Sequence, residues 1–163
     1  MTYKVETFVE PHYPIKKSLL VSVAESTLTS AKVKGKVALA VSVIGDRKMR
    51  SLNKEFRGID EPTDVLSFPY SLQTGKPHEF VTPPSKYLNL GDIIISYPQL
   101  IERAADEEVM VDEMAARLVV HGVLHLLGHE HQNPQEAEAM EAFEDQILSA
   151  FQLNLNSTQR ESS

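Results

Sequence analysis

The sequence predicts a single α+β domain, because its 163 residues contain both strand-like and helix-like segments and match the usual size of one domain. Short alternating or β-branched segments predict four strands, and segments with helical periodicity predict five helices. The predicted strands are residues 3–9, 37–44, 65–68 and 90–96, and the predicted helices are residues 14–27, 47–56, 99–107, 113–127 and 134–153.

The first half of the chain is predicted to alternate between strands and helices. Residues 3–9 alternate weakly between polar and apolar side chains, and residues 37–44 form a β-branched run between two glycines. The helix at residues 14–27 has a proline near its start and apolar side chains on one side. The next helix is predicted to be capped by Asp46 and to end at Gly58.

The second half begins with a predicted edge strand and a long loop. Pro69 follows residues 65–68 and has no N–H to donate, so that strand is predicted to end there or to lie at a sheet edge. Residues 70–87 contain three prolines and one glycine and predict a loop long enough to have a function of its own. Asp112 is predicted to cap the helix at residues 113–127.

The last helix has a clear start signal. Asn133 suits the capping position, Pro134 suits the first helical position, and Glu136 follows three residues after the cap. We predict one domain over residues 1–153, which ends with this helix. Residues 154–163 are polar and lack periodicity, so they are predicted to form a flexible C-terminal tail.

The composition excludes several classes of protein. No apolar run approaches the ~20 residues that cross a bilayer, and the chain begins with charges where a signal peptide is apolar, so a cytoplasmic location is expected. There is no cysteine, so any metal ion must be held by His, Asp or Glu. The net charge of -7 argues against a protein that coats nucleic acid by general attraction.

Four of the six histidines lie close together and predict a metal site. His121 and His125 are four residues apart on an apolar predicted helix, so their imidazoles share one face. Gly128 can end the helix and turn the chain back, which brings His131 toward the first two. Three imidazoles leave a fourth position open, and this arrangement is typical of a catalytic zinc site, where bound water ionises near neutral pH.

Ordinary buried histidines are the alternative interpretation, but burying several imidazoles without a shared ligand is costly. His129 is expected to face solvent in the turn after the helix, because Gly128 breaks the helical geometry. Glu130 is either a proton carrier, an outer partner of a ligand imidazole, or a solvated charge.

Three ordered segments resemble the YbeY endoribonuclease family, also called the ribosomal RNA maturation factors. Residues 121–131 match the family signature His-Gly-x-Leu-His-Leu-x-Gly-x-x-His at every fixed place. Residues 52–69 and 90–96 resemble two further characteristic blocks, so the likeness covers most of residues 36–150. Residues 129–130 are His-Glu where the family often has Tyr-Asp, so no role for an aspartate carries over there.

The resemblance implies an α+β domain in which about five helices pack on a small mixed four-stranded sheet, with a zincin-like metal-binding helix. It implies a metal-dependent, single-strand endoribonuclease, a hydrolase that acts in ribosomal RNA maturation and ribosome quality control. The implied partners are single-stranded RNA, ribosomal RNA and ribosome components, with neither a membrane nor DNA. One divalent metal ion is expected, zinc first, although three imidazoles also suit nickel, copper or iron.

By the same resemblance, Arg57 takes the position of an arginine implicated in catalysis. A guanidinium can hold a phosphate through two hydrogen bonds and offset charge on the scissile group, although a cation at a helix C-terminus is also favourable by itself. Ser67 is the second expected substrate contact and Asp64 a further cleft residue, but a strand hydroxyl and a turn cap explain them equally well. Other cations of the same helix either extend a path for RNA or form a solvated face; they are Arg47, Lys48, Arg50 and Lys54.

Two other functions remain open at this point. A metallopeptidase would share the His-x-x-x-His helix, but such enzymes carry a glutamate as general base directly after the first histidine, where this chain has Gly122. A non-catalytic assembly factor would use the metal for folding and its basic and loop surfaces to contact ribosomal RNA or proteins. For the nuclease, either water or the neighbouring ribose hydroxyl is the nucleophile.

Overall fold

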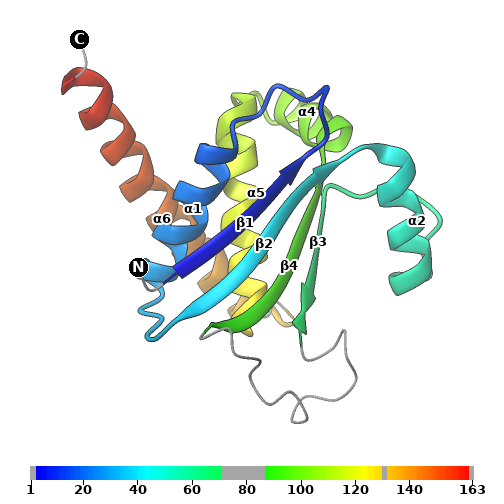
Figure 1. The fold of residues 1–163 in the computed structure, drawn as a ribbon, viewed down its shortest axis with the longest axis horizontal. Helices are drawn as coiled ribbons and strands as arrows, with labels where there is room; N and C mark the ends of the chain where they lie inside the picture. Colours follow the sequence, from blue (N-terminus) through cyan, green and yellow to red (C-terminus); the bar gives the residue numbers. More distant parts are fainter. Residues whose placement is uncertain (1–2, 71–86, 130–131, 162–163) are drawn as a thin grey trace.

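The computed structural model describes residues 3–70, 87–129 and 132–161, with the backbone alone for residues 152–161. Strands and helices follow one another as Figure 1 shows. The strands are β1 (Tyr3–Val9), β2 (Val37–Ile44), β3 (Val65–Pro69) and β4 (Leu88–Ser96), and the helices are α1 (Lys17–Ser30), α2 (Asp46–Arg57), α4 (Tyr97–Asp106), α5 (Val111–Leu126) and α6 (Pro134–Glu161). Every predicted strand and helix is present, which confirms the predicted fold class.

The strands form one mixed sheet in the order β1-β2-β4-β3. β1, β2 and β4 run parallel to one another, whereas β3 pairs with β4 in the antiparallel direction. β3 therefore lies at an edge of the sheet, where Pro69, which has no N–H to donate, is tolerated as its last residue. The predicted edge position of this strand is confirmed.

Helices α1 and α5 cover one face of the sheet and enclose the main core. Val41 and Val43 of β2 and Ile93 and Ile95 of β4 are fully buried there, because alternate residues of a strand point to the same side. α6 contacts both helices and forms the outer part of this layer (Figure 1). The predicted metal-binding helix α5 is thus held between the sheet and α6.

Helix α2 packs on the opposite face over a smaller cluster. Ile44, Met49 and Leu66 are buried in this cluster. The ring of Phe56, near the end of α2, lies 4.9 Å from the ring of Phe68 on β3, measured between centroids. The C-terminal end of α2 is therefore held beside the edge strand.

Two predicted helix caps are wrong. Asp46 is the first residue of α2, which has no side-chain cap, and its carboxylate instead accepts hydrogen bonds from the Ser96 hydroxyl at 2.7 Å and the Gln99 amide at 3.2 Å. α5 begins after Met110, and Asp112 lies within its first turn, where a negative charge is favourable beside the helix dipole. Tertiary contacts with the start of α4 hold Asp46 away from the position that the sequence predicts.

The start of α6 is as predicted, but its end is not. The Asn133 side-chain oxygen accepts a hydrogen bond from the backbone N–H of Glu136 at 2.8 Å, and Pro134 is the first helical residue. The helix continues to Glu161 instead of ending near residue 153. The division between a domain and a flexible tail stays a prediction.

One further segment differs from its prediction, and the structure does not test another. α1 begins at Lys17 rather than at Pro14. The predicted loop at residues 70–87 lies, apart from its two ends, outside the described residues. Among the helices that the structure describes, none combines the length and hydropathy that a membrane span requires.

Candidate active site

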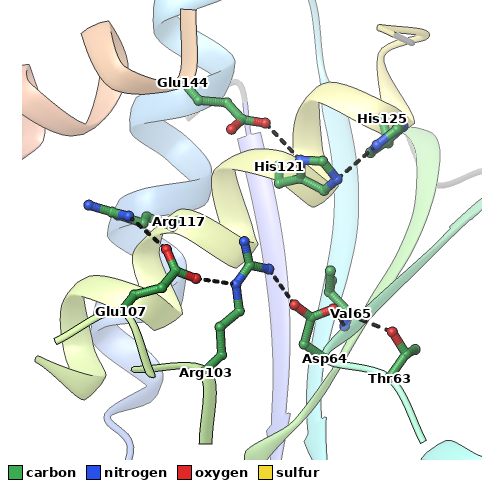
Figure 2. A network of polar contacts seen from close by, with 9 residues as sticks. All are labelled: Thr63, Asp64, Val65, Arg103, Glu107, Arg117, His121, His125 and Glu144. Carbon is green, nitrogen blue, oxygen red and sulfur yellow. Dashed lines mark hydrogen bonds and ion pairs between the residues drawn. The ribbon is translucent and has the colours of Figure 1, made fainter. Parts of the chain in front are cut away.

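Helix α5 places two of the predicted metal ligands side by side. His121 and His125 are one turn apart, so their imidazoles point to the same side of the helix (Figure 2). Their Nε2 atoms are 2.9 Å apart, and their ring centroids are 4.4 Å apart. Both side chains are partly exposed, whereas the residues of α5 that face the sheet are buried. The pair is accessible but rests on a rigid element.

The turn that ends α5 has the predicted geometry. Gly128 has a φ of 93°, and the N–H of His129 donates to the carbonyl of Leu124 at 3.0 Å, a bond typical of the Schellman motif. His129 is exposed, as expected. His131, the third predicted ligand, and Glu130 lie outside the described residues, so the three-histidine site stays a prediction. Within the described part of the chain, no group of three or more His, Cys, Asp or Glu side chains is placed to hold a metal ion.

Glu144 on α6 is a site residue that the sequence analysis missed. Its Oε1 lies 2.7 Å from Nδ1 of His121 (Figure 2). The exposed fraction of the side chain is 32% for His121 and 21% for Glu144, so the contact is partly shielded from water. The helical periodicity of α6 is the sequence signal that could have identified Glu144, because this residue falls on the side of the helix that is buried. The buried residues of that side are Met140, Ile147, Leu148 and Phe151.

The histidine pair fits a divalent metal ion such as zinc. Zinc–nitrogen bonds of about 2.0–2.1 Å at a tetrahedral angle separate two ligand nitrogens by about 3.3 Å. The Nε2 atoms of His121 and His125 are 2.9 Å apart, so a small rotation of the rings would admit the ion. The same distance suits a hydrogen bond between the two rings in the metal-free protein.

A pocket of about 470 Å³ lies beside His121, within the size range of ligand sites. The end of α2, the start of β3, α4, α5 and α6 all contribute to its lining. Arg57 lines it as the exposed last residue of α2, and Gly58, with a φ of 71°, ends that helix as predicted. The structure therefore brings Arg57, the predicted catalytic residue, and His121, a predicted metal ligand, to one pocket.

A network of ion pairs forms the wall of the pocket on the α4 side (Figure 2). Arg103 donates hydrogen bonds to Asp64 and, at 2.7 Å, to Glu107, and Arg117 of α5 lies 3.5 Å from Glu107. Partial burial lowers the pKa of Arg103, but its hydrogen bonds to Glu107 and Asp64 outweigh this effect and raise that pKa above its ordinary value. By contrast, Arg57 has no carboxylate partner among the described residues.

Asp64 and Ser67 take different positions relative to this pocket. Asp64 lines it, and its Oδ1 also accepts a hydrogen bond from the N–H of Val65 at 2.7 Å, so both interpretations of this residue hold. Ser67 is not part of the lining; its hydroxyl donates to the carbonyl of Gly122 at 3.5 Å, a long contact with the backbone of α5. A substrate contact of Ser67 stays a prediction.

Other cations of α2 make contacts away from this pocket. Lys48 lies 3.2 Å from Glu10, and Arg50 forms an ion pair with Asp60 at 2.8 Å. The hydrogen bond from Arg50 lowers the pKa of Asp60 below its ordinary value. Arg47 and Lys48 line a separate, largely apolar pocket on the other side of the sheet. These contacts favour a solvated face over a path for RNA.

Gly122 lets α5 approach the sheet closely. A Cβ atom at this position would lie 2.8 Å from Cγ2 and 3.0 Å from Cδ1 of Ile93, which is fully buried in β4. Position 122 therefore faces the sheet, while His121 faces the pocket. A metallopeptidase needs its general base at this position, and a glutamate there would have no space. The geometry of α5 argues against that alternative.

Comparison with known proteins gives a family for the chain. The family described as "Endoribonuclease YbeY" matches residues 10–152. The chain is 36% identical over 154 residues to the endoribonuclease YbeY of Chloroflexus aggregans, covering 94% of this chain and 99% of that protein, and 37% identical over 153 residues to that of Roseiflexus castenholzii, covering 92% and 94%.

A solved structure supports the fold. A protein of Thermotoga maritima, determined in solution, superposes with a TM-score of 0.57 at 23% identity, covering 92% of this chain and 93% of that one. This likeness concerns the fold alone, whereas the matches at higher identity extend over nearly the whole sequence. The chain therefore belongs to the YbeY endoribonuclease family.

Proposed function

We propose that the chain is a metal-dependent endoribonuclease that cuts single-stranded RNA in the cytoplasm, in ribosomal RNA maturation and ribosome quality control. Family membership supports hydrolysis of RNA, and with it contacts to ribosomal RNA and ribosome components. The observation that carries the metal dependence is the convergence of the His121 and His125 Nε2 atoms, 2.9 Å apart, beside the pocket that Arg57 lines.

Zinc is the first candidate for the ion, with His121, His125 and His131 as ligands and one position left for a reactant. When bound, a divalent ion there supplies Lewis-acid chemistry to a phosphodiester. The chain's own contribution is to hold the two imidazoles close together: α5 is buried against the sheet, so its backbone is fixed and only a small rotation of the rings is needed to admit the ion.

Arg57 is the proposed phosphate-binding residue. Its guanidinium can donate two parallel hydrogen bonds to the oxygens of one phosphate and offset the charge that develops there. Arg103 lines the same pocket but is already engaged by Asp64 and Glu107. Arg57 therefore meets an incoming phosphate at a lower cost, since none of the described residues holds it in an ion pair that would have to break.

The acidic residues of α6 explain why a cation matters for RNA at this pocket. Glu141, Glu144 and Asp145 all line it, and a phosphodiester that approaches these carboxylates is repelled unless positive charge lies between them. We therefore expect removal of the metal with a chelator to weaken binding of single-stranded RNA as well as its cleavage, which a fluorescence anisotropy titration would measure.

Cleavage assays with a matched pair of histidine variants test the proposal. The protein is purified without a metal-affinity resin, its metal content is determined by elemental analysis, and end-labelled single-stranded RNA is the substrate. We expect His125→Ala to abolish cleavage and reduce the bound metal. His129→Ala is the control, because this exposed histidine lies beside Phe143, with ring centroids 5.8 Å apart, and lines no part of the pocket. Equal cleavage by wild-type and His125→Ala proteins would contradict the proposal.

Arg57 variants separate catalysis from a purely structural role in ribosome assembly. Arg57→Ala is expected to lower kcat by about 10²–10³-fold, as for other groups that offset charge in a transition state, with unchanged metal content. Arg57→Lys should restore part of the rate, because it returns the charge without the bidentate geometry. Intact processing of ribosomal RNA in cells that carry only Arg57→Ala would favour the assembly factor.

A further inference from the structure

We propose that Glu144 is a positioning residue of the metal site, which holds the proton of His121 on Nδ1 and so leaves Nε2 as the nitrogen that binds the ion. The proposal rests on the metal-dependent function proposed above. It concerns α6, a helix that supplies none of the predicted ligands, and a contact that joins residues far apart in the sequence.

The chemistry of a carboxylate sets the position of the proton. An ionised carboxylate only accepts hydrogen bonds, so the 2.7 Å contact with Glu144 Oε1 requires a proton on Nδ1 of His121. A neutral imidazole has a single ring proton, and Nε2 then carries the lone pair. That nitrogen points toward His125, which is where the two rings converge (Figure 2).

This assignment also determines the proton on His125 in the metal-free protein. Two neutral ring nitrogens 2.9 Å apart need one proton between them. Because Glu144 keeps the proton of His121 on Nδ1, the proton between the rings belongs to Nε2 of His125. Of these two histidines, only His125 then has to change its tautomer when the ion binds, and His121 is ready beforehand.

Stability gives no reason for a carboxylate at this position. Glu144 lies on the side of α6 that is otherwise apolar, between Met140 and Ile147, and only 21% of its side chain is exposed. Partial burial of a charged group costs free energy that an apolar residue of similar size would avoid. Glu141, one turn earlier, is exposed and has no hydrogen bond to a histidine that the structure describes. The position of Glu144 is therefore explained by its contact with His121.

The test compares Glu144→Gln, which keeps the shape of the side chain and removes its charge, with Glu141→Gln, which removes a charge from the same pocket without touching His121. Zinc affinity is measured by competition with a chromogenic chelator. We expect Glu144→Gln to raise the Kd for zinc by about 10–100-fold, the effect typical of losing an outer partner of a ligand histidine. Glu141→Gln should change the Kd by less than about 3-fold, because an exposed charge is screened by solvent.

A second readout does not depend on the metal. Nitrogen-15 NMR of the metal-free proteins reports which ring nitrogen of His121 carries the proton. We expect Nδ1 protonation in the wild-type chain and in Glu141→Gln, and a shift toward Nε2 protonation in Glu144→Gln. The thermal midpoints of the metal-free proteins should stay close to one another, which a residue needed only for folding would not allow.

The possible results are distinct. A zinc Kd and a His121 tautomer that Glu144→Gln leaves unchanged would overturn the positioning role while the metal-dependent function stands. Equal weakening by Glu141→Gln would also overturn it, because net charge alone would then be responsible. If the wild-type chain itself binds no zinc at the histidines, the proposed function fails, and the role of Glu144 fails with it.

Discussion

Substitution of Gly122 by alanine tests how closely α5 must approach the sheet. The added Cβ would lie 2.8 Å from Cγ2 and 3.0 Å from both Cγ1 and Cδ1 of Ile93, which is fully buried and cannot move aside freely. Either the isoleucine leaves its rotamer or α5 moves away from β4. A movement of α5 would also displace His121 relative to the pocket.

Two opposing contributions decide the magnitude for Gly122→Ala. Forcing an extra methyl group into a packed core costs about 1–3 kcal/mol. Replacing glycine by alanine inside a helix gains about 0.8–1.0 kcal/mol. The difference is a net loss of about 0–2 kcal/mol, and we expect about 1 kcal/mol, which corresponds to a fall in Tm of about 2–4 °C for a domain of this size.

Urea unfolding of a double-mutant cycle measures this contribution. Ile93→Ala removes all three atoms that the new methyl group would meet, so Gly122→Ala should become stabilising by about 1 kcal/mol in that background. Ala142→Gly on the exposed side of α6 calibrates the helix preference and should cost about 1 kcal/mol. A Gly122→Ala protein that is more stable than the wild type, by as much as Ala142→Gly is less stable, would refute the close contact.

Three further substitutions test local features of the fold. Gly58→Ala should destabilise the protein by about 1–2 kcal/mol in urea unfolding, because the left-handed conformation is strained for a residue with a Cβ and nothing else crowds this position; no change would show that the helix end adjusts. Asn133→Ala should cost about 1 kcal/mol by loss of the hydrogen bond to the N–H of Glu136, and a neutral effect would exclude that cap. Arg50→Gln should raise the pKa of Asp60 toward its ordinary value in an NMR titration, since the hydrogen bond from Arg50 is the main cause of the lowering. Because the folded-state pKa of Asp60 is lowered, the pair stabilises the protein at pH values above the unfolded pKa, and this stabilisation is lost as the pH falls through the folded value. A pKa of Asp60 that stays as low in Arg50→Gln as in the wild-type protein would contradict the pairing.

The order of strands and helices was predictable because the signals for it are local. Alternation over residues 3–9, the β-branched run at residues 37–44 and the start signal at Asn133 each depend on neighbours within a few positions. The errors have the opposite origin. Asp46 fails as a cap because Ser96 and Gln99, distant in the sequence, bind its carboxylate.

The same distinction between local signals and tertiary contacts applies to the candidate site. The spacing of His121 and His125 determined by itself that the two imidazoles meet, since residues four apart on a helix share a face. Only the tertiary structure decided that Glu144 contacts His121 and that Arg57 lines the same pocket. Those contacts depend on how α6 and α2 pack around the sheet, and helix packing is determined by the combined burial of many side chains rather than by the identity of any one of them.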